Sequence, residues 1–596
     1  MKNIKKLALI SAVISIVGLQ SCYDEKMEWK DNPYGKPIDD SEIPLMTDEL
    51  LMGLDVLKKY APFEIGVGID IELYMKGKEL TNIVNENFNA VTVGYHMKHG
   101  PMVGADGQLR YTIVDQFIRD HLPQDMAIFG HALGWHQNQN GEYLRSLIKP
   151  DKLEPKDLSA HNLLDLSGLK NGSFSGWGRL NQGAGITVVD NEGITEGEKA
   201  LRMISSRTSK NEWDLQLSSP DITVESGKEY TVSFFIRSDK PGRGRISFEK
   251  GMGTTNAEKY PSLDYEGSGT AEASFSTGTN WKQIRFNITV KTNPLQLYFD
   301  LGHLPEVTYY IDINHLDVVP SNVDDCKANI IGKDFSEKKE LIAEAFRYWV
   351  TEMVGHYKHR IKSWDVVNEL VNDAGGIRYG NKNGDSGDIF HWQDFWTEDE
   401  DDRGDEGGIK YAVEAFRLAR AAGNPDDVLY INDYNLEYNL NKCRKLIEYV
   451  ERIDSEGREV DGKNLVDGIG TQMHVSYDNN VEDIKEMFRL LAATGKQIKV
   501  SELDIKVKTA SPDPARLEEQ AEMYYQIVKA YREIIPENQQ AGITVWGISD
   551  HVDEHVNWIP DDAPCLWDNK YNRKKVYIRF VEALTGKSAN DILKGK

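Results

Sequence analysis

Two glutamates in this sequence stand where apolar runs stop or are interrupted. Glu369 follows the run SWDVV and the amide Asn368, and Glu502 lies in IKVSELDI, two residues before Asp504. A buried strand interior disfavours an unpaired carboxylate, so each glutamate needs a structural or a chemical reason to be there. Two such carboxyl groups that face one site from different strands can share proton transfer and nucleophilic attack on a sugar.

Further polar and aromatic residues follow other apolar runs. They are His131, Trp135 and His136 in FGHALGWH, Gln472 and His474 in GIGTQMHV, and Trp546 in GITVWGIS. Taken singly, a glutamate at a strand end is usually solvated or caps a helix, and a histidine or tryptophan usually completes a core. Their recurrence at the end of one strand after another favours a shared site.

The elements that must position these residues are eight predicted strands separated by amphipathic helices. The strand runs cover residues 63–69, 88–94, 127–135, 362–369, 428–435, 467–475, 498–505 and 542–550. Between them, stretches such as 336–359 and 517–535 place apolar residues three and four positions apart, as a helix with one buried face does. This alternation predicts an α/β fold, a (β/α)8 barrel, whose active site lies at the carboxyl ends of the strands.

The barrel pattern is interrupted after the third strand. From about residue 163 to residue 319 the sequence shows alternating strands split by Gly, Ser, Asn and Thr turns, with no helical pattern. This predicts an inserted all-β sandwich, a jelly roll, over residues 155–322. Because it replaces a connection after a barrel strand, we expect it to emerge on the catalytic face and to extend glycan contact. Its candidate stacking residues are Trp177, Trp213, Tyr260 and Tyr265, and a place in the core is the alternative for each of them.

The N-terminus reads as a targeting segment. MKNIKK is basic, LALISAVISIVGL is apolar and too short to span a bilayer, and LQSC follows. This resembles a bacterial lipoprotein signal over residues 1–21 with Cys22 as the lipidated residue; an ordinary secretory signal is the alternative. Residues 22–45 then form a tether, and the barrel occupies 46–152 and 325–596. The expected location is the outer membrane, facing the periplasm or the cell surface, with the lipid as the membrane contact.

Charge and cysteine content exclude several classes of partner and of stabilisation. The net charge is −25, so the long-range field repels nucleic acids and anionic lipid headgroups. Beyond Cys22 the chain has Cys326, Cys443 and Cys565, an odd and widely spaced set that implies no disulfide framework. A neutral polymer remains open as the substrate.

With these motifs in view, the chain resembles the β-xylanases of glycoside hydrolase family 10. The similarity rests on SWDVVNE, LYINDYN, VDGIGTQMHV, VSELDI and GITVWGISD, together with FGHALGWH and ENFNAVTVGYHMK. The insert resembles carbohydrate-binding modules of families 4, 9 and 22 through NGSFSGW, GEKALRM and YYIDINHLDVV. The resemblance implies a retaining endo-hydrolase of β-1,4-xylosidic bonds in xylan that needs no cofactor and no metal.

The resemblance also implies roles for individual residues. Glu369 matches the acid/base, which must hold a proton near neutral pH, and Glu502 matches the nucleophile, with the two carboxyl groups about 5–5.5 Å apart. Asn368 is expected to hydrogen-bond the sugar 2-hydroxyl, His474 to hold the carboxylate of Glu502, and Asp504 to steady His474. The positions that match the lining of the sugar subsites are Lys98, His131, Trp135, Gln472, Trp546 and Trp558.

The sequence departs from the family at one end of the expected cleft. Where the family has a Glu-Asn pair, TVGYHMK carries Gly94 and Tyr95, and Asn138 replaces a glutamine. These changes predict a distal glycone subsite that relies on stacking and free volume instead of hydrogen bonds. Weak action on short linear xylo-oligosaccharides, recovered on long or branched xylan, would follow.

Three other functions stay open at this point. HVDEH, residues 551–555, fits a metallopeptidase pattern, but that pattern needs a helix and this copy follows a strand and precedes Pro560. A lipoprotein that binds glycans without cutting them is a second alternative, which the presence of both glutamates disfavours. A hydrolase of a related β-1,4-glycan is the third.

Overall fold

A computed structural model describes residues 46–150, 152–266, 268, 273–380, 385–556 and 558–595. The predicted signal, Cys22 and the tether lie outside the described residues. The chain divides into two compact units: one runs up to Leu147 and resumes at Lys338, and the other is Ile148–Glu337. Among the described residues, none of the helices combines the length and apolarity that crossing a bilayer requires.

The first unit is a closed barrel of parallel strands, which confirms the predicted fold. Its strands are β1 (Ile65–Ile69), β2 (Ala90–Val93), β3 (Ala127–Gly130), β17 (Ser363–Asn368), β18 (Val428–Asp433), β19 (Gly468–Thr471), β21 (Gln497–Lys506) and β22 (Gln540–Trp546). Each pairs in parallel with the next, β22 pairs with β1, and β19 pairs with β21, so the ring closes. The carboxyl ends of all eight strands therefore meet at one end of the barrel.

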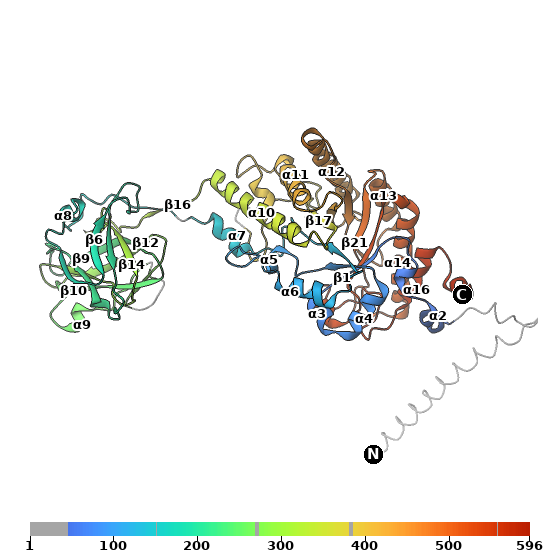
Figure 1. Cartoon of the computed structure of the whole chain (residues 1–596), viewed down its shortest axis with the longest axis horizontal. Helices are drawn as coiled ribbons and strands as arrows, with labels where there is room; N and C mark the ends of the chain where they lie inside the picture. Colours follow the sequence, from blue (N-terminus) through green and yellow to red (C-terminus); the bar gives the residue numbers. More distant parts are fainter. Residues whose placement is uncertain are drawn as a thin grey trace, which may run out of the picture. The chain divides into compact units, whose positions relative to one another are not determined.

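Helices surround these strands (Figure 1). They are α2 (Thr47–Gly53), α3 (Ile71–Lys76), α4 (Lys78–Asn87), α5 (His99–Met102), α6 (Thr112–Gln116), α7 (Gly141–Ile148), α10 (Phe335–Tyr357), α11 (Asp405–Ala422), α12 (Leu440–Asp461), α13 (Val481–Ala492), α14 (Pro514–Ile534), α15 (Val552–His555), α16 (Lys575–Thr585) and α17 (Ala589–Lys594). Local sequence sets their ends: α14 starts with Asp513 accepting the Arg516 N–H and with Pro514 in its first turn.

The sixth predicted strand is not continuous, so that prediction was wrong. After β19, Met473 takes a positive φ of 62°, and a short strand β20 (His474–Ser476) follows. β20 pairs in parallel with β21, and the register puts His474 opposite Asp504. The break re-aims the chain so that the imidazole faces the acidic residues of its neighbour.

The second unit is an all-β module of two antiparallel sheets. One sheet has the order β11 (Phe275–Thr277), β10 (Gly242–Lys250), β13 (Gln296–Asp300), β8 (Leu215–Ser218), β5 (Gly178–Gln182). The other has the order β12 (Lys282–Thr289), β9 (Glu229–Ser238), β14 (Thr308–Asp312), β7 (Ala200–Ile204), β6 (Gly185–Val189), with β15 (Asp317–Pro320) also on β9. Alternate residues of both sheets share one buried core, among them Met203, Phe234 and Phe248.

One detail of this module differs from the expectation, and its place in the chain agrees with it. Single helical turns do occur, at α8 (Ser167–Lys170) and α9 (Asn256–Lys259). In α9, Thr255 and Glu258 form a reciprocal capping box, which a four-residue turn allows. In chain order the module follows β3 and the short helix α7 and precedes α10 and β17, joined through the paired strands β4 (Lys152–Glu154) and β16 (Asn329–Ile331). It therefore interrupts the barrel after its third strand, as predicted.

Candidate functional site

Glu369 lies at the carboxyl end of β17, one residue beyond the strand. Its φ is 58°, and its N–H donates to the carbonyl oxygen of Asn432 at 2.8 Å, which fixes the turned-out backbone. The residue is buried, with 7% of its surface exposed. One carboxylate oxygen accepts from Gln472 Nε2 at 3.1 Å and from Asn368 Nδ2 at 3.4 Å. The carboxyl group is thus held by neutral amides and not by a cation.

Glu502 on β21 has a different environment. Its Oε1 accepts from Asn432 Nδ2 at 3.0 Å, and its Oε2 lies 3.3 Å from His474 Nε2. Burial opposes ionisation, but the electrostatic effects of His131, His474 and Lys98 outweigh it and lower the pKa of Glu502 to about 2. This group is therefore a carboxylate across the physiological range, as a nucleophile must be.

His474 links the carboxylate of Glu502 to a second acidic side chain, that of Asp504. Its Nδ1 lies 2.7 Å from Asp504 Oδ2, and the same oxygen accepts from Trp558 Nε1 at 2.9 Å. Burial opposes the charged imidazole, yet the carboxylates of Asp504 and Glu502 raise the pKa of His474 to about 10. His474 is therefore a charged imidazolium at neutral pH, and hydrogen bonds hold it between Asp504 and Glu502.

Asn432 joins the two halves of the site and was not predicted. Its Nδ2 donates both to Glu502 and, at 3.0 Å, to Asn368 Oδ1, while its Oδ1 accepts from Ser501 Oγ at 2.7 Å. The residue is fully buried at the end of β18. Its place in the middle of the quoted LYINDYN run, where the apolar residues give way to polar ones, is a signal that could have identified it.

Glu369 also has an imidazole beside it, that of His136. His136 Nδ1 is 4.0 Å from Glu369 Oε2, and the ring of His391 stacks on His136 at 4.9 Å. Asp385 accepts from both the backbone N–H and Nδ1 of His391, at 3.0 and 2.8 Å. Burial, reinforced by Arg378, lowers the pKa of His136 to about 3, so this imidazole is neutral beside Glu369.

Lys98, Trp135 and His131 line another side of the site. Lys98 Nζ lies 4.4 Å from the ring centroid of Trp135, and burial lowers its pKa to about 8 although Glu502 and Glu369 both favour its charged form. His131 Nδ1 contacts Asp365 Oδ2 at 2.8 Å, and both residues are buried. Asp365 was not predicted; it lies inside the quoted SWDVVNE run, three residues before Asn368.

Trp546 is the last residue of β22 and lies beside Gly94, in the predicted glycone subsite. Its ring lies 5.8 Å from that of His131 and 6.4 Å from that of His474. A Cβ at Gly94 would lie 3.4 Å from the indole of Trp546, so this ring bounds part of the volume predicted to be vacant. Tyr95, 48% exposed, leaves a ring accessible at the same place.

The HVDEH segment is not organised as a metallopeptidase site. His551 stacks on Tyr571 at 5.7 Å, while both ring nitrogens of His555 face backbone carbonyl oxygens, those of Ser549 at 2.8 Å and Trp558 at 3.2 Å. Glu554 accepts the Ile548 N–H at 2.8 Å. Within the described ranges, no group of converging metal-ligand side chains includes both histidines.

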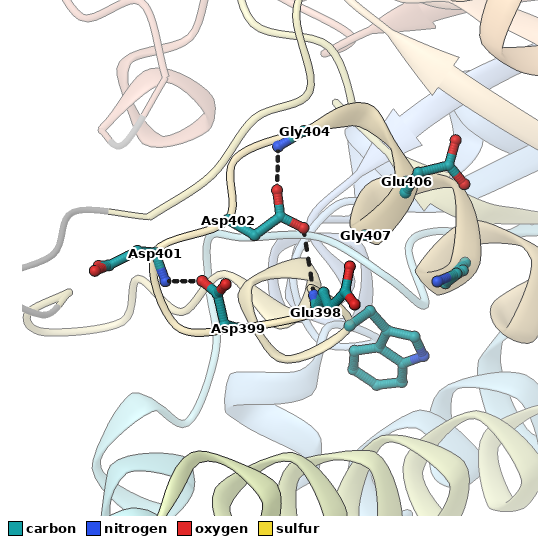
Figure 2. A pocket seen from close by; sticks show the side chains of 9 residues that line it. Glu398, Asp399, Asp401, Asp402, Gly404, Glu406 and Gly407 are labelled. Atoms are coloured by element: carbon teal, nitrogen blue, oxygen red, sulfur yellow. Dashed lines mark hydrogen bonds between the residues drawn. The ribbon is translucent and has the colours of Figure 1, made fainter.

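An acidic loop before α11 lines a surface pocket of its own (Figure 2). Its carboxylates are occupied by the loop backbone: Asp399 accepts the Asp401 N–H at 2.9 Å, and Asp402 accepts the Gly404 N–H at 2.8 Å. These side chains are not among the groups of described residues that converge as metal ligands. The pocket shares none of its lining residues with the glutamate site, so we assign it no role in the chemistry.

The module exposes aromatic rings beside the sheet that contains β10. Trp213 is 47% exposed and Tyr260 is 44% exposed, and the guanidinium carbon of Arg245 lies 5.8 and 4.9 Å from their ring centroids. For Trp177 and Tyr265 the core alternative holds, because both belong to the buried core. Trp213 and Tyr260 remain available to a ligand.

Comparisons with family models cover most of the chain. A model described as glycosyl hydrolase family 10 matches residues 55–162 and 327–583. A model described as carbohydrate binding domain matches residues 165–308, between the two segments of the first. The two matches follow the same division as the barrel strands and the all-β module.

Individual relatives match parts of the chain. It is 32% identical over 261 residues to endo-1,4-beta-xylanase C of Paenibacillus barcinonensis, a match that covers 41% of this chain and 22% of that protein. It is 32% identical over 275 residues to endo-1,4-beta-xylanase A of Cellvibrio japonicus (strain Ueda107), which covers 42% of each. The chain thus spans less than half the length of these relatives. A solved structure of GH10 from Paenibacillus barcinonensis aligns over 89% of this chain and 97% of its own, with a TM-score of 0.49 and 20% identity.

Proposed function

Because the chain belongs to glycosyl hydrolase family 10, we propose that it hydrolyses internal β-1,4-xylosidic bonds of xylan with retention of configuration. The similarity to xylanases of Paenibacillus barcinonensis and Cellvibrio japonicus supports xylan as the polymer. The N-terminal lipid anchor at Cys22 is part of the same proposal, because an exported enzyme would meet its polymer outside the cell.

One observation carries the mechanism: Asn432 lies between two buried glutamates whose surroundings differ. Glu502 is ion-paired and hydrogen-bonded as a carboxylate, whereas Glu369 receives hydrogen bonds from neutral amides and faces a neutral imidazole. Pairs of carboxyl groups held in unlike environments are suited to divide acid/base and nucleophilic roles. Glu502 is accordingly the nucleophile, and Glu369 the acid/base.

The reaction then proceeds in two displacements. The Glu502 carboxylate attacks the anomeric carbon while Glu369 gives its proton to the departing glycosidic oxygen, which leaves a glycosyl ester on Glu502. Glu369, now a carboxylate, takes a proton from water as the water oxygen attacks the same carbon and releases Glu502. Asn368 is placed next to Glu369 to hydrogen-bond the sugar, and His474 keeps Glu502 oriented through both steps.

Product analysis tests this proposal. The purified chain should release short β-1,4-xylo-oligosaccharides from xylan, and the new reducing ends should appear first as the β-anomer in early NMR spectra. Cellulose and mannan serve as matched polymers, and linear xylotetraose should be cut more slowly than branched xylan because of Gly94 and Tyr95. Action on another β-1,4-glycan alone would overturn the substrate, an α-anomer would overturn retention, and binding without release would favour the glycan-binding alternative.

The module is proposed to bind the same polymer through Trp213 and Tyr260. Exposed rings beside a sheet offer flat apolar surfaces to sugar faces, and truncating an aromatic hot spot of an interface costs about 1 kcal/mol or more. In the full chain made inactive by Glu502→Gln, Trp213→Ala should weaken retardation on a xylan affinity gel by about fivefold or more. Trp213→Phe, which keeps a ring, should retain most of the binding. Unchanged retardation in the alanine variant would remove this face from glycan binding.

A further inference from the structure

The module carries a second row of arginines and aromatic rings, on the outer side of the sheet that contains β9. The strand register puts Arg237 opposite Tyr310, Tyr310 opposite Arg202, and Arg202 opposite Thr187. Trp281, just before β12, extends the row, because the Arg237 guanidinium carbon lies 5.3 Å from its ring centroid. Directly opposite residues of antiparallel strands share a face, so these five side chains form one line, roughly 19 Å across five strands.

The row faces away from the module core. The neighbours of its members along each strand, among them Leu201, Met203, Tyr309 and Ile311, are buried in that core. Side chains alternate across a strand, so Arg202 and Tyr310 must point to the other side. Thr187 is exposed, and Trp281, Tyr310 and the two arginines are partly exposed. A polymer can therefore reach this line.

Arg237 and Arg202 differ in whether an acidic side chain pairs with the guanidinium group. Arg237 forms an ion pair with Glu192 and lies over Tyr310, with the guanidinium carbon 4.0 Å from the ring centroid. Arg202 has no acidic partner within the described part of the chain, and its Nε is buried without a hydrogen bond there. On the other sheet, by contrast, Arg245 is ion-paired with the buried Asp300 at 3.0 Å. An unpaired, partly buried guanidinium is costly, and a carboxylate that accepts from its two terminal nitrogens would offset part of this cost.

We propose that this row is a second glycan-binding site, which recognises xylan bearing uronic acid side groups. The carboxylate of the side group binds Arg202, and Trp281 and Tyr310 contact the sugar rings beside it. A planar guanidinium binds a carboxylate through two parallel hydrogen bonds, which gives selectivity for the acidic sugar over a neutral one. The net charge of −25 does not prevent this, because charges more than about 8 Å away are screened at physiological ionic strength.

This inference rests on the proposed function only in its choice of xylan as the polymer. Binding to glucuronoxylan and to its carboxyl-reduced form is measured by titration calorimetry, with the full chain made inactive by Glu502→Gln. The two polymers differ only in charge on the side groups. We expect about tenfold tighter binding to the acidic form, as one charge-assisted bidentate contact provides, and a loss of this preference as salt is raised.

Variants separate the row from the other sheet. Arg202→Gln should remove the preference for the acidic polymer while binding to the reduced polymer stays within about twofold, and Arg202→Lys should keep part of it. Arg179→Gln, which removes an exposed arginine from β5 of the opposite sheet, is the charge-matched control and should keep the full preference. Thermal unfolding of each variant checks that the module is folded.

Two results would overturn the inference: equal affinity of the parent chain for both polymers, or an intact acidic preference in Arg202→Gln. In either case the arginine and ring row would serve only to stabilise the sheet. Hydrolysis of xylan by the unmodified chain is measured alongside. Hydrolysis without the acidic preference defeats this inference alone, and the preference without hydrolysis defeats the proposed reaction alone.

Discussion

Replacing Glu502 by alanine should lower the rate of xylan hydrolysis by about 10⁴–10⁶-fold, the scale expected when a covalent nucleophile is removed. The loss should be equally severe on aryl xylobiosides with good leaving groups, because bond formation to the anomeric carbon fails whatever the leaving group. Steady-state kinetics on both substrate types measures this. The reason is structural: Glu502 is the carboxylate that His474 and Asn432 hold in place.

Glu502→Gln is the matched control, because it keeps the size of the side chain and removes its charge. Both variants leave the imidazolium of His474 with one carboxylate partner, Asp504, so thermal unfolding must show that the barrel is intact. With an activated β-aryl substrate, added azide can occupy the vacated space in the alanine variant and attack from that side. The product should be the α-glycosyl azide. A variant that keeps more than a tenth of the wild-type rate would contradict the assignment of Glu502.

Replacing Glu369 by alanine should slow xylan hydrolysis by about 10²–10⁴-fold, the usual contribution of a general acid. A dinitrophenyl xylobioside should form the glycosyl-enzyme almost as fast as in the wild type, because its leaving group departs without a proton. Hydrolysis of the glycosyl-enzyme should become rate-limiting, since no base remains to activate water. The release of dinitrophenol over time should therefore show a burst followed by slow turnover.

Azide provides the decisive control for Glu369. As an anion it needs no base, so it should rescue the second step of Glu369→Ala and give the β-glycosyl azide, opposite in configuration to the product from Glu502→Ala. His136→Phe, beside Glu369, should not show rescue, because the carboxyl group is still present. Equal losses of Glu369→Ala on both substrates, without azide rescue, would remove the acid/base assignment.

Much of the barrel and of its site could be predicted from local sequence. Apolar runs of strand length, alternating with helical periodicity, define the eight strands, and parallel strands bring their carboxyl ends to one face. Glu369 and Glu502 were therefore expected near one another without any knowledge of contacts. The same local signals marked the module, because turn residues and alternating apolar residues recur at short range within it.

Other features depend on contacts between distant parts of the chain. Asn432 and Glu502 are 70 residues apart in sequence. Neither segment indicates that the side-chain amide of Asn432 donates to both Glu502 and Asn368. The backbone turn at Met473, which pairs His474 with Asp504, broke a run that looked like a continuous strand. Such details follow from register and packing, which apolar periodicity does not specify.

The residue types at the strand ends, and hence the class of chemistry, can be read from the order of amino acids alone. The electrostatic state and exposure of these residues depend on the folded molecule. The charge of Glu502 is set by its burial and by its neighbours. Among the aromatic residues of the module, Trp177 and Tyr265 are buried in the core, whereas Trp213 and Tyr260 are exposed at the surface. The physical reason is that periodicity along a chain reports which side of a strand a residue occupies, whereas charge state and accessibility depend on everything packed against that side.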